Sequence, residues 1–137
     1  MSSLRIVPLF GILWGVYNAL LLTGVVPSAL AQPLFSLTLV SGAVWSLTLS
    51  ELLIALGVLA LYIEILKATR TTLSAVIDHT VSTAVFIAFL IEFIIVEGAG
   101  NSTFLILGLM SLLDAIAGFT ISIIAARRDI ELGKTLD

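Results

Sequence analysis

Two carboxylates lie inside long apolar runs of this chain, and these side chains are the strongest candidates for a functional role. Asp114 lies near the middle of the run from Thr103 to Arg127, and Glu92 lies toward the end of the preceding run. Ionisable side chains within apolar helices mark proton or ion pathways, or polar contacts buried between helices. No Lys or Arg is near either residue in the sequence, and an unpaired carboxylate in apolar surroundings tends to take up a proton.

The residues around Asp114 favour an inward-facing position. Ser111, Gly118 and Ser122 share its helix face by three- and four-residue spacing, so this small and polar face should pack against other helices. We therefore expect Asp114 to hydrogen-bond across helices, while a proton- or ion-linked role and a contact with a partner subunit stay open. Glu92 lies nearer the end of its run, which favours the structural role there.

A second group of ionisable residues lies close to basic ones. Glu64 precedes Lys67 by one turn, and Arg70, Asp78 and His79 follow within a short stretch. This grouping is typical of a charge cluster at a membrane boundary, and we expect it to anchor the cytoplasmic end of the helices. His79 is the sole histidine, so the chain alone cannot supply two imidazoles to a haem, and a hydrogen-bonded interfacial position is favoured.

The sequence contains no recognisable catalytic set. It has no His, Asp and Glu group at metal-ligand spacing, no Gly-rich phosphate loop and no nucleophile paired with a base. It also lacks cysteine, which excludes disulfides and thiolate metal sites. A formal net charge of −3 gives no basic surface for nucleic acid. We expect a protein that is not an enzyme, has no cofactor and does not bind nucleic acid.

These residues must be positioned by apolar helices, because 60% of the residues are hydrophobic and 11% are charged, proportions far from those of a soluble domain. Four apolar stretches are long enough to cross a bilayer. The first, with Arg5 before it and Ala29-Leu30-Ala31 after it, imitates a signal peptide but is longer than a usual signal core, so we expect it to be retained. The sequence predicts an all-α, four-helix transmembrane bundle forming a single domain over 1–137, with spans at about 4–25, 50–69, 72–96 and 103–127.

A small β-hairpin is predicted at about 34–49, between the first two spans. The stretch 35–40 alternates apolar and polar residues, and 43–49 resumes the alternation after Ser41-Gly42, which reads as a two-residue turn. Its apolar face would consist of Leu37, Leu39, Trp45 and Leu47. Because open strand edges are not tolerated in hydrocarbon, the hairpin should lie at or outside the periplasmic interface. A short interfacial or re-entrant helix is the alternative.

Helix ends and helix contacts can also be predicted. Ser50 is expected to cap the second span, and Asn101 or Ser102 the fourth. The short connections between the last three spans predict antiparallel neighbours. Small residues that let helices approach closely, within this chain or across a homodimer, are Gly11, Gly15 and Gly118.

All basic residues fall on one predicted side of the membrane. Because cytoplasmic loops are enriched in Lys and Arg, both termini should be cytoplasmic in a multi-pass protein of the bacterial inner (plasma) membrane. The six residues that carry this prediction are Arg5, Lys67, Arg70, Arg127, Arg128 and Lys134.

Several short motifs carry a family resemblance over residues 34 to 128. They are the stretch Ser41-Gly42-Ala43-Val44-Trp45, the ending Glu64 to Arg70, the pair Asp78-His79, and the runs Asp114 to Phe119 and Ala125 to Arg128. With these motifs the chain resembles a family of small four-span bacterial inner-membrane proteins of uncharacterised activity. The resemblance implies a compartment and a four-span layout, and no activity or site residues.

The functional expectation is a structural or accessory subunit of a larger membrane complex, or a homo-oligomer, with the lipid bilayer and other membrane subunits or itself as partners. The alternative is a proton- or ion-linked transporter or channel component that uses Asp114, with Glu92 and Asp78 as relay positions. That alternative predicts a water-accessible cavity at Asp114 and a broken helix or a wide gap between helices. A dry Asp114 bonded to Ser82 or Thr83 would contradict it.

Overall fold

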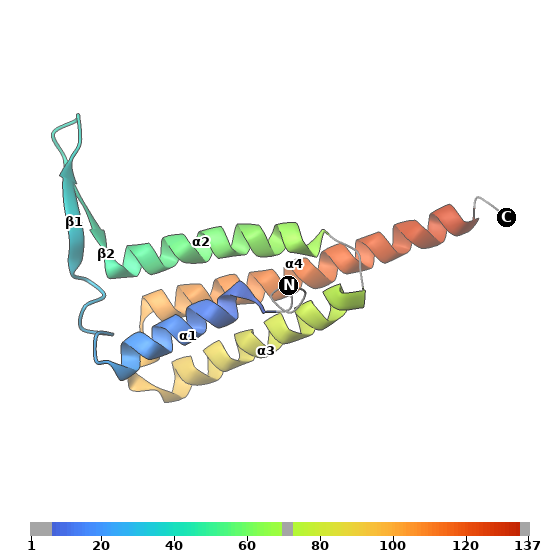
Figure 1. Ribbon diagram of the computed structural model, residues 1–137, viewed down its shortest axis with the longest axis horizontal. Helices are drawn as coiled ribbons and strands as arrows, with labels where there is room; N and C mark the ends of the chain where they lie inside the picture. The colour runs from blue at the N-terminus through green and yellow to red at the C-terminus, as the bar shows by residue number, and fades with distance from the viewer. Residues whose placement is uncertain (1–6, 70–72, 135–137) are drawn as a thin grey trace.

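The computed structural model describes residues 7–69 and 73–134, which form four helices and a small antiparallel sheet. The helices run roughly along the long axis of the molecule, and the two strands stand at one end, here called the hairpin end (Figure 1). In chain order the elements are α1 (Leu9–Leu22), β1 (Pro33–Thr38), β2 (Val44–Thr48), α2 (Leu49–Ala68), α3 (Leu73–Ile95), the 3-10 helix η2 (Glu97–Ala99) and α4 (Ser102–Lys134).

Within the described residues, three helices are long and apolar enough to cross a membrane, namely those containing Leu49–Ala68, Val76–Ile95 and Ser102–Glu131. They confirm the predicted helical segments at 50–69, 72–96 and 103–127 to within a residue at most ends. The fourth is longer than predicted, because the charged tail continues the helix to Lys134. Its last turns extend beyond the ends of α2 and α3 (Figure 1).

The first helix is shorter than the predicted span 4–25. It has 14 residues, from Leu9 to Leu22. Pro8, in extended conformation, precedes its first residue, and Gly24 at φ +75° ends it before Pro27. Residues 4–6 of the predicted span, together with Arg5, lie outside the described residues.

The hairpin is confirmed, but its turn was predicted wrongly. The strands pair antiparallel with Leu37 opposite Trp45 and Ser36 opposite Ser46. The Gly42 N–H donates to Leu39 O, and Gly42 has φ +84°. The connection is therefore a longer loop in which glycine takes the left-handed position, rather than a two-residue Ser-Gly turn.

The hairpin joins α2 without a linker. Thr48, the last residue of β2, is the N-cap of α2, and its side chain and that of Glu51 form a reciprocal capping box. The predicted cap Ser50 has another role: its N–H donates to Leu30 O, and its hydroxyl lies 2.7 Å from the Thr103 hydroxyl of α4. The orientation of the hairpin on the bundle is thus set by specific hydrogen bonds.

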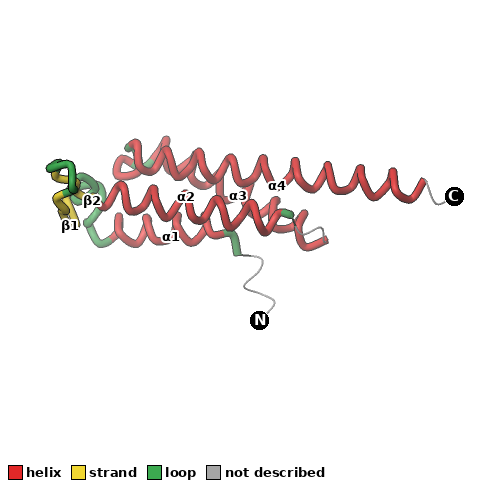
Figure 2. Tube along the Cα trace, turned by 90° about the horizontal axis from the view of Figure 1, so that it is seen from above, coloured by secondary structure: helices red, strands yellow, loops and turns green. Residues whose placement is uncertain are grey.

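The last three helices were predicted to be neighbours. This holds for α3 with α4, but α2 has little contact with α3 among the described residues. α4 packs along both α3 and α2, while α1 contacts α2 and α3 from the other side. Figure 2 shows α4 running the length of the bundle and beyond it. The core near the hairpin end is aromatic, with the ring of Phe104 lying 4.6 Å from that of Tyr17 and 5.0 Å from that of Phe89.

Candidate functional site

Ionisable side chains from three helices meet inside the bundle, toward the end opposite the hairpin. We call this group the charge cluster. It consists of Glu64 and Lys67 of α2, Asp78, His79 and Ser82 of α3, and Asp114 of α4. It brings together four of the five predicted site residues; Glu92 lies elsewhere. Since Glu64, His79, Ser82 and Asp114 are each at most 3% exposed, the cluster is buried.

Glu64 joins α1 to α2. Its Oε1 accepts from the backbone N–H of Leu9 at 2.6 Å, and its Oε2 accepts from Lys67 Nζ at 2.8 Å. Leu9 is the first residue of α1, and no side chain caps this helix from Pro8. A carboxylate at a helix N-terminus satisfies an otherwise free N–H and interacts favourably with the helix dipole. The predicted grouping of Glu64 with Lys67 and Asp78 is present, and the Glu64 side chain is 2% exposed and pairs inward. Its place at a membrane boundary stays a prediction.

Lys67 is shared between two acids. Besides Glu64, its Nζ lies 3.7 Å from Asp78 Oδ2 across the gap between α2 and α3. Asp78 Oδ1 is buried and has no hydrogen-bond partner among the described residues. Arg70, which the sequence also offered for this group, lies outside those residues. A single ammonium group thus serves two carboxylates.

Asp114 is the least compensated acid of the cluster. The Ser82 hydroxyl hydrogen-bonds to its carboxylate, and Glu64, Asp78 and Lys67 are close enough to act on it electrostatically. Its second oxygen, Oδ2, finds no partner within the described part of the chain. Lys67 acts on Asp114 electrostatically, but its ammonium group pairs with Glu64 and Asp78 and forms no ion pair with Asp114. The predicted hydrogen bond across helices is present.

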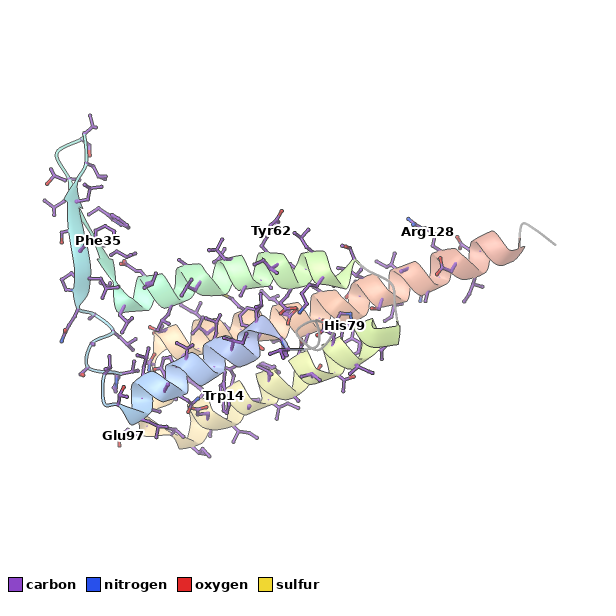
Figure 3. All side chains as sticks on the ribbon, in the orientation of Figure 1. Trp14, Phe35, Tyr62, His79, Glu97 and Arg128 are labelled. Carbon is purple, nitrogen blue, oxygen red and sulfur yellow. The ribbon has the colours of Figure 1, made fainter. Side chains whose placement is uncertain are left out.

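His79 packs into a space that Gly118 leaves open. A Cβ added at Gly118 would overlap the imidazole ring, so the two helices can approach only with glycine there. The ring nitrogen Nε2 lies 3.1 Å from the Ser122 hydroxyl, and the residue is 3% exposed. Figure 3 places His79 in the opposite half of the bundle from the hairpin. His79 is hydrogen-bonded as predicted and is buried within the bundle. Its position at a membrane interface stays a prediction.

The other two glycines that were singled out behave differently from each other. A Cβ at Gly11 would make ordinary contacts with Pro8 and with Val85 of α3. Gly15 is exposed, and a Cβ added at Gly15 would have no atom of another segment within 4 Å. Gly11 therefore faces a neighbour in the same chain, whereas Gly15 faces outward.

Glu92 forms a separate site with α1. Its Oε2 accepts from the Trp14 indole N–H at 2.5 Å and from the Asn18 amide at 3.0 Å, and it is 8% exposed. Its Oε1 is buried and without a partner among the described residues. Trp14 lies where α1 meets the α3 side of the bundle (Figure 3). Sequence reasoning missed both donors, although their four-residue spacing places them on one helix face.

A third polar group was also missed. Asn101 donates to the Tyr17 hydroxyl at 2.6 Å, and Tyr17 in turn donates to Gly98 O at 3.1 Å. The Asn101 side-chain oxygen accepts from Phe104 N, so Asn101 is the cap of α4, one of the two residues predicted for that role. This group fixes the hairpin end of α1 to the connection between α3 and α4.

No group of three His, Asp or Glu side chains with metal-binding geometry occurs among the residues that the structure describes. Comparison with models of known protein families, with curated proteins and with solved structures gives no match. The resemblance to small four-span inner-membrane proteins therefore stays a prediction, and function must be argued from the geometry.

The Glu92 site gives a direct stability prediction. Glu92→Leu is expected to lower the free energy of unfolding by about 1–2 kcal/mol, because the N–H groups of Trp14 and Asn18 lose their acceptor. Glu92→Gln keeps an acceptor oxygen and should lose less. Unfolding by a denaturing detergent, followed by tryptophan fluorescence, measures both. Equal losses in the two variants would contradict a role for these hydrogen bonds.

Proposed function

We propose that the chain is a multi-pass protein of a bacterial inner membrane, with the hairpin outside and both termini in the cytoplasm. The three long apolar helices support insertion, and many of their aliphatic side chains are exposed, as contact with lipid requires. Lys67 lies in the last turn of α2, and Arg127 and Arg128 lie in the last three turns of α4, toward the end opposite the hairpin (Figure 3). These positions support this orientation.

Within the membrane we propose that the protein is an accessory subunit that binds another membrane subunit through its hairpin. The observation that carries this proposal is the unpartnered apolar face of the hairpin. Phe35, Leu37, Leu39 and Trp45 lie on one face of the two strands and are between 42% and 53% exposed. The hairpin stands off the bundle across the direction of the helices, with Phe35 beyond the end of α2 (Figure 3). A two-stranded hairpin is at best marginally stable in water alone, so a bound surface should support it.

The strand edges favour a protein over lipid as this surface. β1 and β2 pair with each other, and no further strand of the described chain pairs with their outer edges. The stretch 32–50 contains no Asp, Glu, Lys or Arg, so it lacks the charges that usually protect an open edge. A strand of a partner subunit would satisfy the free N–H and C=O groups as well as cover the apolar face.

The test is purification in native lipid, comparing the wild type with a Leu37→Ser, Leu39→Ser variant. We expect a stoichiometric partner to co-purify with the wild type and to be lost from the variant. Ser36→Ala, which alters the opposite face of the hairpin, is the matched control and should retain the partner. A wild-type protein that purifies as a monomer without a partner would contradict the proposal, and a complex of identical copies would identify the partner as a second copy of this chain.

The transporter alternative has less support. Asp114 is 3% exposed and bonded to Ser82, and α4 runs through it as one continuous helix. A carboxylate that carries ions between two aqueous phases needs access to both, commonly through a broken helix or a cavity. These observations count against the alternative.

A further inference from the structure

Among the described residues, the charge cluster contains more negative than positive charge. Three carboxylates, Glu64, Asp78 and Asp114, face one described ammonium group, that of Lys67. Neutral groups from the neighbouring elements also contact the acids: the first N–H of α1 on Glu64, and Ser82 of α3 on Asp114. His79 of α3 is near Asp78, Glu64 and Lys67 and is hydrogen-bonded to Ser122. Full ionisation of all three acids would leave uncompensated charge in the interior, which is strongly unfavourable.

Two carboxylate oxygens of the charge cluster have no hydrogen-bond donor among the described residues. Asp78 Oδ1 and Asp114 Oδ2 are both buried, and neither accepts a hydrogen bond from the described residues. Glu64, by contrast, has a donor on each oxygen, and Asp78 shares Lys67. Asp114 accepts a hydrogen bond from the Ser82 hydroxyl and has no ion pair with a described cation. Its negative charge is therefore the least compensated of the three.

We propose that the charge cluster is a proton-binding site and that Asp114 carries the proton. A proton on Asp114 removes one negative charge from the cluster. It also adds an O–H donor to a cluster in which Asp78 Oδ1 and Asp114 Oδ2 accept no hydrogen bond from the described residues. A divalent metal ion is the other candidate for the missing charge, but the described His, Asp and Glu side chains do not form a ligand set for one. Asp78 is 13% exposed and Lys67 is 27% exposed, so exchange with water runs through these two residues. The proposal is independent of the partner assigned to the hairpin.

Infrared spectroscopy of the purified protein in lipid tests this directly, because a protonated carboxylic acid has a C=O stretching band that a carboxylate lacks. We expect the wild type to show this band in weakly acidic buffer, just above the pH range in which exposed acids lose their protons, and Asp114→Asn to lose it. Ser82→Ala should shift the band and not abolish it, because the hydroxyl that bonds to the acid is removed. Glu97→Gln, which changes an exposed acid, should leave the band unchanged.

Three results would overturn the proposal. One is a wild-type spectrum without the band, which needs no variant to fold. The second is a band that survives Asp114→Asn and disappears in Glu92→Gln, which would place the proton at the other buried acid. The third is loss of the wild-type band when sodium chloride replaces choline chloride at constant pH, which would make a metal cation the bound species.

Discussion

Lys67→Met is expected to lower the free energy of unfolding by about 3 kcal/mol. The change removes the one described ammonium group that pairs with Glu64 and Asp78, and it leaves a buried and a partly buried carboxylate without a cation from the described residues. Removal of one partner of a buried ion pair typically costs about 3–5 kcal/mol. We expect the lower end of this range, because the Lys67 side chain is 27% exposed and water compensates part of the loss. Unfolding by denaturing detergent, at constant lipid composition, provides the measurement.

Two further variants separate this effect from a general loss of charge. Arg128→Met removes an exposed cation near the end of α4 and should change stability by less than about 0.5 kcal/mol. Adding Glu64→Gln to the Lys67→Met protein removes one of the uncompensated charges and should recover part of the loss. If Lys67→Met proved as harmless as Arg128→Met, the ion pairs would not form in the protein.

Gly118→Ala is expected to lower the free energy of unfolding by about 3 kcal/mol. The new methyl group would overlap the imidazole of His79, so α3 and α4 would have to separate or the ring would have to move. Overpacking of this kind costs about 1–3 kcal/mol. Loss of the hydrogen bond between His79 and Ser122 adds about 1 kcal/mol. Thermal unfolding in detergent micelles, read from tryptophan fluorescence, can detect a change of this size.

Gly15→Ala is the matched control, because Gly15 also lies within a helix but faces outward with nothing within 4 Å. It should be neutral or stabilising by up to about 1 kcal/mol, as expected for glycine replaced by alanine in a helix. Adding His79→Ala to Gly118→Ala removes the overlapping ring and should restore part of the stability. A Gly118→Ala protein as stable as Gly15→Ala would show that the helices do not pack closely there.

Local patterns were sufficient to predict most of the elements. Apolar length identified α2, α3 and α4, and strict alternation identified the two strands, because each depends on residues close in sequence. The ends were less accurate. Sequence favoured Ser50 as a cap, whereas the chain uses Thr48, since Ser50 is engaged by Leu30 and Thr103 from distant segments. Such contacts are not visible in a local window.

The site residues were predicted better than their partners. Asp114 and Glu92 were selected because acids are costly in apolar segments, and both are buried. Their partners could not be found by the same reasoning. Trp14 and Leu9 N come from a helix whose position depends on packing, and Lys67 meets Asp78 from a different helix. Pairing between helices is set by three-dimensional arrangement, which charge and spacing within one helix do not determine.

The direct junction of β2 with α2 has a mechanical consequence. Since Thr48 ends the strand and caps the helix, no flexible linker separates the hairpin from Lys67 at the other end of α2. We therefore expect a partner that holds the hairpin to fix the direction of α2 as well, and with it the position of Lys67 and its ion pairs.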